Sequence, residues 1–280
     1  LFYTKNMKNK CILKCVLFAL VAFNSLAIMA QTTQQAAKPE KKFLQPERVR
    51  YDGSCMTIEG KDIFIYSAAF HYFRCPEELW RDRFRQIKEA GFNTVETYVP
   101  WNWHERIMPS GLNDNSHFDF SDVKRWLKMA QEEFGLYTIV RPGPFICAEY
   151  SGGGYPRWLA KFCPGGMDDF WLRSADHRHI SWSQHWFDAV CKALADEQIT
   201  RKPVGEKGII LIQIENEYNH HGCYGKEKLL KALYQSVRKS GMDIPIFTCL
   251  TNECRSSEDV ELSQVFDSDN YYVGLSSAPD

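Results

Sequence analysis

The sequence has no excess of charge of either sign. Its 280 residues include 34 lysines and arginines against 35 aspartates and glutamates, which gives a formal net charge of −1. A chain without a strong field cannot hold nucleic acid or an anionic membrane by long-range attraction. We therefore expect a small or neutral partner and no nucleic acid.

Metal-binding and phosphate-binding patterns are also missing. No pair among the eight cysteines after residue 30 has zinc-finger spacing, and Cys249 and Cys254 lack an accompanying pair of histidine ligands. No glycine-rich phosphate turn follows the first predicted strand. We expect neither a metal ion nor an organic cofactor. Cys11 and Cys15 fall in a predicted signal, and the other eight leave room for one or two disulfides whose pairing the sequence does not determine.

The apolar run near the N-terminus is too short for a membrane span. Lys8 and Lys10 precede this run, which extends over residues 15–28 and is interrupted by two polar residues. The pattern predicts a signal peptide over residues 1–30, with Met7 as the start and export to the periplasm or the outside of the cell. A retained membrane anchor is the alternative.

The rest of the chain is rich enough in apolar residues for one large core. Hydrophobic residues make up 44% and aromatic residues 14% of the sequence. Residues 31–45, rich in Gln, Thr, Ala and Lys, predict a disordered leader. Residues 46–280 are then expected to form a single large domain. The abundant aromatic side chains suit the gripping of sugar rings by their apolar faces.

Strand-like and helix-like periodicities alternate along this domain. Strands are expected at 63–72, 94–99, 136–141, 209–214, 246–250 and 265–273, and helices at 77–90, 122–134, 177–195 and 226–239. Ser121 is the expected cap of the second helix. The alternation predicts an α/β fold, a (β/α)8 TIM barrel that is incomplete, with about six of its eight units present. An open doubly wound sheet is the alternative, and the missing phosphate turn disfavours it.

The fourth predicted strand delivers carboxylates to its end. Glu215, Asn216 and Glu217 follow an almost wholly apolar strand, as expected for one buried between two layers. Glycoside cleavage needs a carboxylic acid that protonates the leaving oxygen, and partial burial at such a strand end favours the protonated form. We predict Glu217 as this acid. The alternative is a polar strand end that merely faces solvent.

Several motifs resemble those of glycoside hydrolase family 35, the family of the lysosomal and plant β-galactosidases, from about residue 50 onward. They are FHYFR at 70–74 with WRDR at 80–83, TYVPWNWHE at 97–105, RPGPFICAE at 141–149 and QIENEY at 213–218. The resemblance implies a barrel fold, a retaining mechanism and a preference for terminal, non-reducing β-galactose.

The resemblance also implies roles for single residues. Glu217 corresponds to the acid/base of the family. The residues that correspond to the lining of its terminal-sugar pocket are Tyr98, Cys147, Ala148, Glu149 and Asn216. Taken alone, Tyr98 could be an ordinary strand aromatic, Cys147 a buried small residue and Glu149 a loop carboxylate. Three tryptophans, Trp101, Trp103 and Trp158, are expected to pack at the rim rather than to stack on the sugar.

The second carboxylate has no candidate within the chain. In the family it is a glutamate at the end of the seventh strand, and no seventh strand is predicted before Asp280. The nucleophile is therefore expected beyond residue 280, and the polypeptide as given is expected to be inactive. Glu253 follows the fifth strand, which is the wrong position, and is interpreted as a loop charge.

Departures from the family pattern flank the predicted acid. Arg106 stands where the family commonly has proline, the loop at 107–117 looks longer than usual, and residues 206–208 differ from the usual Gly-Gly-Pro. Asn219 replaces a usual glycine. These changes bear on substrate identity more than on reaction type. The alternatives are a hydrolase of another β-glycoside, such as a β-glucosaminide, and a carbohydrate-binding barrel that has lost catalysis.

Overall fold

The computed structural model describes residues 44–162, 171–218, 226–249, 251, 254 and 257–270. The predicted signal peptide at 1–30 and the predicted leader, apart from its last two residues, lie outside this part of the chain. Gln45 is described, and its side-chain amide donates to the Asp243 carboxylate at 3.0 Å. None of the helices within the described ranges is both long enough and apolar enough to span a membrane.

A six-stranded parallel sheet organises the domain. Its strands are β4 (Ser67–Ala69), β5 (Thr94–Tyr98), β6 (Tyr137–Arg141), β7 (Ile209–Gln213), β8 (Ile246–Cys249) and β9 (Phe266–Ser268). They lie side by side in the order of the sequence, and every neighbouring pair is parallel. Sequential parallel strands joined by crossovers are the arrangement of a (β/α) barrel. The predicted fold class, a partial barrel with about six units, is confirmed.

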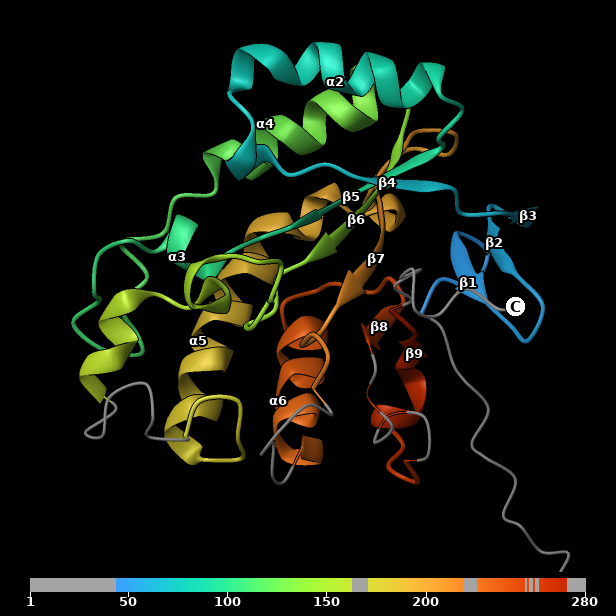
Figure 1. The fold of residues 1–280 in the computed structure, drawn as a ribbon. Helices are drawn as coiled ribbons and strands as arrows, with labels where there is room; N and C mark the ends of the chain where they lie inside the picture. The colour runs from blue at the N-terminus through green and yellow to red at the C-terminus, as the bar shows by residue number, and fades with distance from the viewer. Residues whose placement is uncertain are drawn as a thin grey trace, which may run out of the picture. The chain divides into compact units, whose positions relative to one another are not determined.

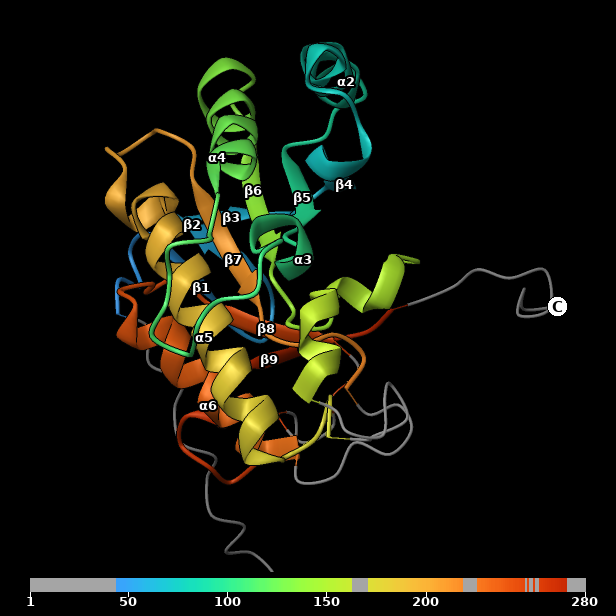
Figure 2. The ribbon, with the colours of Figure 1, turned by 90° about the vertical axis from the view of Figure 1, so that its left-hand side faces the viewer.

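Helices follow the strands as the crossovers require. The longer ones are α2 (Glu77–Glu89), α4 (Ser121–Lys128), α5 (His177–Leu194) and α6 (Lys226–Lys239). Figure 1 shows α2 beside α4, and the Arg125 side chain of α4 donates to Glu77 of α2 at 2.9 Å. The α5 and α6 helices also lie side by side in Figures 1 and 2. These helices match the predicted ones closely, except that α4 continues as a short π-helix (Met129–Glu133).

The predicted cap of α4 is wrong. Ser121 is the first residue of the helix, and its backbone N–H donates to the Asp119 carboxylate at 2.9 Å. The Asp119 carboxylate thus binds one of the N–H groups that the first turn of a helix leaves without an intrahelical partner. By contrast, Asp176 caps α5 by accepting the Arg178 N–H at 2.8 Å.

A small antiparallel sheet precedes the barrel and was not predicted. It consists of β1 (Val49–Tyr51), β2 (Met56–Ile58) and β3 (Lys61–Ile63). The predicted strand at 63–72 is therefore wrong in its extent, because its first residue closes this small sheet and only 67–69 enters the barrel. Arg48 donates to the Ile199 carbonyl at 2.7 Å, just before β7, so the small sheet lies by the amino ends of the barrel strands.

One core joins the small sheet, the barrel strands and the helices that cover them. All residues of β7 are buried, as its apolar sequence predicted. Trp101 is fully buried and stacks on Trp186 with 5.9 Å between ring centroids, and Trp158 is 7% exposed. The prediction that Trp101 and Trp158 pack rather than present faces to a sugar is confirmed. Cys55, Cys75, Cys147, Cys191 and Cys249 are free thiols, so none of these five takes part in an expected disulfide.

Candidate active site

The predicted site residues lie at the carboxyl ends of three neighbouring strands. Tyr98 ends β5, the segment 147–149 follows β6, and Asn216 and Glu217 follow β7. Because these strands are adjacent and parallel, their carboxyl ends meet at one end of the barrel, where active sites of this fold lie. Tyr98 is also the register partner of Arg141, the last residue of β6.

Arg141 joins two of the predicted residues. Its guanidinium lies over the Tyr98 ring, 4.2 Å from the centroid, and donates to the Asn216 side-chain oxygen at 3.0 Å. A third contact is an ion pair with Glu96 at 3.1 Å. Burial raises the pKa of Tyr98 to about 12, with the Arg141 charge opposing the rise. The phenol therefore stays protonated at neutral pH and can donate a hydrogen bond.

Glu217, which follows β7, is held by the ends of β8 and β9. Its backbone N–H donates to the Cys249 carbonyl at 3.1 Å, and its carboxylate accepts a hydrogen bond from the Asn270 amide at 2.5 Å. The side chain is only half-buried. The carboxyl can therefore meet a ligand while one oxygen is fixed. Asn270 was missed in the sequence because nothing in the pattern near β9 pairs it with a residue 53 positions earlier.

Glu215, two residues away, has a different environment. It is fully buried, and burial raises the pKa of its carboxyl, an effect that the Arg173 guanidinium opposes. Arg173 donates to this carboxylate at 2.9 Å, and the Asn216 backbone N–H donates to the same oxygen at 2.9 Å. A carboxylate enclosed in this way cannot reach a substrate. Glu215 therefore fixes the turn that presents Glu217.

Arg173 is a second residue that the sequence did not reveal. Besides Glu215, its guanidinium donates to the carbonyls of Asn216 at 2.7 Å and Glu217 at 3.2 Å. It also lies 3.8 Å from the centroid of the Phe145 ring. One side chain from the segment before α5 thus fastens the turn after β7 to the loop after β6. No sequence motif links it to the acid.

The loop after β6 has an unusual backbone. Cys147, Ala148 and Glu149 are consecutive residues with φ of 56°, 54° and 45°, and Glu215 and Glu217 also have positive φ, at 54° and 50°. Left-handed conformations are rare for residues other than glycine, and they cluster at functional sites where the surroundings enforce them. Four of these five residues are predicted site positions, and the fifth, Glu215, directly precedes the predicted Asn216.

The side chains of this loop are held to different degrees. Cys147 lies close enough to Tyr98 for its thiol to act on the pKa of the phenol, and the Ala148 carbonyl accepts a hydrogen bond from Arg74. Glu149 is exposed and forms no hydrogen bond or ion pair with any described residue. The structure thus joins Tyr98 and Asn216 through Arg141, with Glu217 next in the chain, and leaves the Glu149 carboxylate open to a ligand.

Two further predictions from the sequence concern metal binding and Glu253. Within the described ranges, no group of three or more His, Cys, Asp or Glu side chains could hold a metal ion. Glu253, which the sequence interpretation treats as a loop charge, lies outside the described residues.

Comparisons with known proteins show the family of the chain. The family described as Glycosyl hydrolases family 35 matches residues 55–278. "Beta-galactosidase-1-like protein 3" of Homo sapiens is 36% identical over 190 residues, which cover 66% of this chain and 26% of that protein.

Two further relatives come from distant organisms. "Beta-galactosidase 1" of Dictyostelium discoideum is 39% identical over 59% of this chain and 22% of its own length. "Exo-beta-D-glucosaminidase" of Pyrococcus horikoshii is 40% identical over 42% of this chain and 15% of its own length. The chain thus spans about a quarter or less of the length of these relatives.

Proposed function

Because this chain belongs to glycosyl hydrolase family 35, we propose that it is part of a retaining glycosidase that removes terminal, non-reducing β-D-galactose from oligosaccharides or glycans. The family that the sequence motifs predicted is thereby confirmed. The activity, the substrate and the residue roles described below are the proposal.

The observation that carries the proposal is the position of Glu217. Its half-buried carboxyl stands at the end of a buried strand, with one oxygen bound by Asn270 and with Asn216 and Tyr98 at adjacent positions. In the proposed reaction Glu217 gives its proton to the glycosidic oxygen as the bond from this oxygen to the anomeric carbon breaks. After the leaving group departs, Glu217 takes a proton from the incoming water.

The second carboxylate of the reaction is expected beyond residue 280. It would attack the anomeric carbon and form a glycosyl-enzyme, which water then cleaves with retention of configuration. Among the described residues, Tyr98 and Asn216 would bind hydroxyls of the galactose ring, and the open Glu149 carboxylate would accept hydrogen bonds from others. Cys147 and Ala148 would shape the wall between them.

The test is the release of nitrophenol from the full-length protein. We expect 4-nitrophenyl β-galactoside to be cleaved with a higher kcat/KM than the corresponding β-glucoside and β-N-acetylglucosaminide or β-glucosaminide. A β-glucosaminide is the second candidate substrate, because a relative that is 40% identical is named an exo-β-D-glucosaminidase. Preference for the glucosaminide would replace the galactoside proposal with that candidate.

The same assay distinguishes the proposed enzyme from a carbohydrate-binding barrel that has no catalytic activity. Such a protein would bind galactose but release no nitrophenol from any of these glycosides. That result, obtained with protein that is folded and full-length, would overturn the proposed activity.

We also propose that the protein is exported. The support is the pair of lysines at 8 and 10 followed by the apolar run at 15–28, which is typical of a cleaved signal. Sequencing the N-terminus of the mature protein from its native host is the test. A mature protein that still begins near Met7 would contradict export with cleavage.

A further inference from the structure

A cavity of about 530 Å³ lies beside the loop that carries the predicted sugar-binding residues. It is bordered by the end of α3 (Trp101–His104), by the 3-10 turn η3 (Ser151–Gly154) and by the 3-10 helix η4 (Arg157–Phe162). These segments follow β5 and β6, so the cavity opens at the same end of the barrel as the candidate active site. Tyr150 lines it directly after Glu149. The predicted galactose contacts do not account for this space.

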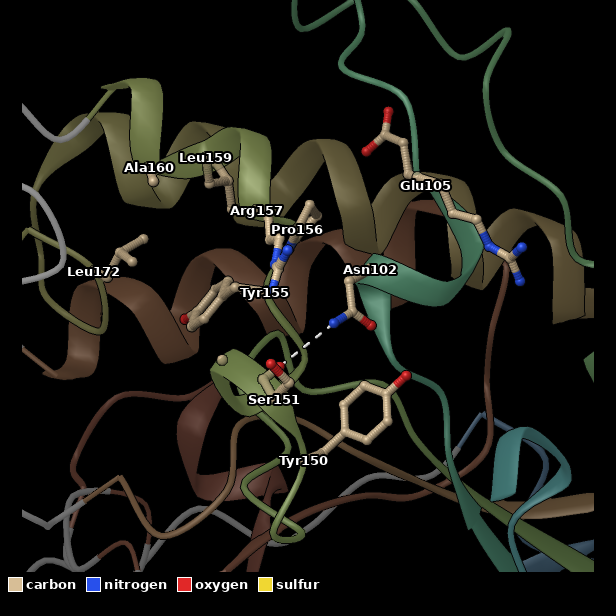
Figure 3. A pocket seen from close by; sticks show the side chains of 12 residues that line it. Asn102, Glu105, Tyr150, Ser151, Tyr155, Pro156, Arg157, Leu159, Ala160 and Leu172 are labelled. Carbon is tan, nitrogen blue, oxygen red and sulfur yellow. Dashed lines mark hydrogen bonds between the residues drawn. The ribbon is translucent and has the colours of Figure 1, made fainter. Parts of the chain in front are cut away.

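The cavity contains a cation without an anionic partner. Arg157 is exposed and forms no hydrogen bond or ion pair with any residue in the described ranges. Other described arginines, such as Arg125 and Arg178, are paired with carboxylates at 2.9 Å and 2.8 Å. Figure 3 shows the Arg157 side chain extending from η4 toward Asn102 on α3. An unpaired guanidinium beside a cavity is suited to a carboxylate or sulfate ligand.

Glu105, an acidic residue of the cavity lining, does not neutralise Arg157. Glu105 is completely buried, and its two oxygens are occupied by the His185 imidazole at 2.8 Å and the Trp101 indole N–H at 2.7 Å. No other acidic residue lines the cavity among the described residues. The lining therefore offers a positive charge to a ligand and no free negative one.

A second arginine adds to the positive field. Arg106 lines the same cavity, and its contacts in the described part are the Trp103 carbonyl, at 3.1 Å, and the ring of that residue. Burial raises the pKa of the Tyr150 hydroxyl, and the charges of Arg106 and Arg74 oppose this rise. The charge of Arg106 therefore reaches the hydroxyl that lines the cavity. Arg106 also departs from the family pattern, in which proline is common at this position.

Two other features suit a sugar ring. The side-chain oxygen of Asn102 is buried and has no donor among the described residues, while its amide N–H is 3.5 Å from the Ser151 carbonyl. This acceptor can take a hydrogen bond from a ligand hydroxyl. The rings of Tyr150 and Tyr155 supply flat apolar surface in the same cavity. A cation, an open acceptor and aromatic faces together match an acidic sugar better than a simple inorganic anion.

We propose that this cavity is a subsite for an acidic sugar residue, a uronate or a sulfated sugar, of the glycan that the protein processes. Arg157 would bind the carboxylate or sulfate, Asn102 a hydroxyl, and Tyr150 the ring. The inference rests on the proposed glycosidase function, because it assigns the cavity to another part of the same substrate. It narrows that substrate to galactosides of acidic glycans.

The test measures binding apart from catalysis. Full-length protein is titrated calorimetrically with D-glucuronate, D-glucose 6-sulfate and D-glucose at low salt, in excess D-galactose that occupies the proposed galactose pocket. At least one acidic sugar is expected to bind about tenfold more tightly than glucose, and the preference is expected to weaken at high salt. Which of the two acids binds distinguishes a carboxylate from a sulfate ligand.

Variants test whether the preference for an acidic sugar depends on Arg157. Arg157→Gln is expected to abolish the preference, and Arg157→Lys to retain part of it because the charge remains without the planar fork. Arg83→Gln, which removes an exposed arginine of α2 far along the chain from the cavity, is the matched control and is expected to leave the preference unchanged.

Two results would overturn the proposal. One is equal binding of glucose and both acidic sugars, and the other is a preference that persists in Arg157→Gln. The proposed glycosidase activity is tested independently, because Arg157→Gln is expected to cleave neutral 4-nitrophenyl β-galactoside as the unmodified protein does. Loss of the acid preference with this cleavage intact supports the subsite, whereas no cleavage by either protein refutes the glycosidase.

Discussion

Two glutamates separated by one residue illustrate how surroundings decide the role of a carboxyl group. Glu215 is fully buried, and Arg173 and a backbone amide bind one of its oxygens. Glu217 is half-buried, and the Asn270 amide binds one of its oxygens. Only the second carboxyl can approach a substrate. A Glu-Asn-Glu sequence alone does not distinguish these roles, because both glutamates follow the same strand.

Replacing the proposed acid tests its role in proton transfer. Glu217→Gln keeps a hydrogen-bonding group of the same size but cannot donate the proton. We expect kcat/KM, which reports the step in which the leaving group departs, to fall by about 10²–10⁴-fold for a galactoside with a poor leaving group such as lactose. For 2,4-dinitrophenyl β-galactoside, whose leaving group departs without protonation, the loss should be much smaller.

The matched variant is Glu149→Gln, which removes a proposed sugar contact instead of the acid. It should lower kcat/KM for lactose and for the aryl galactoside by similar factors. If Glu217→Gln also lowers both equally, Glu217 is not the acid.

The pairing of Arg173 with Glu215 predicts a stability change that depends on pH. In Arg173→Gln the buried carboxylate loses its cation, so its pKa rises further above the ordinary value of 4.5. A carboxyl with a raised folded-state pKa destabilises the fold as the pH rises through that value, because the folded state then has to release a proton that it binds more tightly. We expect a loss of about 3 kcal/mol in unfolding free energy at pH 7.5 and a smaller loss at pH 4.5. Urea denaturation at both pH values measures it.

Arg178→Gln is the control for this prediction. Arg178 pairs with Asp176 in the same segment, and this pairing lowers the pKa of Asp176 to about 2. Asp176 is therefore ionised at both pH values, and the effect of Arg178→Gln should not differ between them. A loss in Arg173→Gln that is likewise independent of pH would contradict the account of Glu215.

At the scale of helices and strands, the sequence predicts well wherever one periodicity dominates. The apolar run of β7 is buried on both sides, and α2 and α6 end where Gly91 and Gly241 adopt positive φ. Long helices and buried strands carry their signal in many residues at once, so no single contact can override it. The location of Tyr98 and Glu217 at strand ends follows from the same signal.

The elements that were missed depend on contacts between distant residues. The segment at 61–69 is divided between two sheets because β3 pairs with β2, while β4 pairs with β5. The left-handed turns at 147–149 and the clamp formed by Arg173 likewise have no local pattern. They arise from packing between loops that lie far apart in the sequence, and local sequence patterns carry no information about such contacts.

The glycines of η3 fix the loop that carries the predicted sugar contacts. Gly153 has φ of 60°, and its carbonyl accepts the Ile146 N–H at 2.8 Å. A methyl group at this position would lie 2.0 Å from the Phe145 ring, whereas one at Gly152, with φ of 64°, would meet nothing within 4 Å. Both substitutions by alanine strain the backbone equally. We expect Gly153→Ala to cost about 1–3 kcal/mol more in unfolding free energy than Gly152→Ala, as overpacking does.

Thermal or urea unfolding of the two alanine variants measures this difference. Because Phe145 lies under Arg173, Gly153→Ala should also weaken the binding of galactose, and Gly152→Ala should leave it nearly unchanged. Equal stability of both variants would show that the Phe145 ring moves aside freely and does not fix the loop.

In the domain as a whole, the two ends of the barrel have different roles, one structural and one functional. The small sheet is anchored by Arg48 at the amino ends of the strands, and the candidate site and the acidic-sugar subsite lie at the carboxyl ends. This separation is usual in barrels, where one end stabilises and the other carries chemistry. Between them lies a core that also encloses ionisable groups, and these tie the stability of the domain to pH.

Two buried histidines predict that the folded domain is sensitive to acid. Burial lowers the pKa of His104 and His179 to about 4. Each is bonded through Nε2 to a tyrosine hydroxyl, Tyr72 at 2.5 Å and Tyr155 at 2.8 Å, an arrangement that suits the neutral ring. In the unfolded chain both would titrate near the ordinary value of 6.5. The unfolded state therefore binds more protons between pH 6.5 and 4, and stability falls as the pH is lowered through this window.

Each histidine should contribute on the order of 2–3 kcal/mol to this loss by pH 4. We expect His104→Gln to be less stable than the unmodified protein at pH 7, because it disturbs the bond to Tyr72, but to lose less stability between pH 6.5 and 4.5. His177→Gln, at a side chain that is 90% exposed, should leave the pH dependence unchanged. Urea titrations across this range give the unfolding free energy of each protein at each pH. If the slope of this free energy against pH is the same in all three proteins, His104 does not resist protonation in the fold.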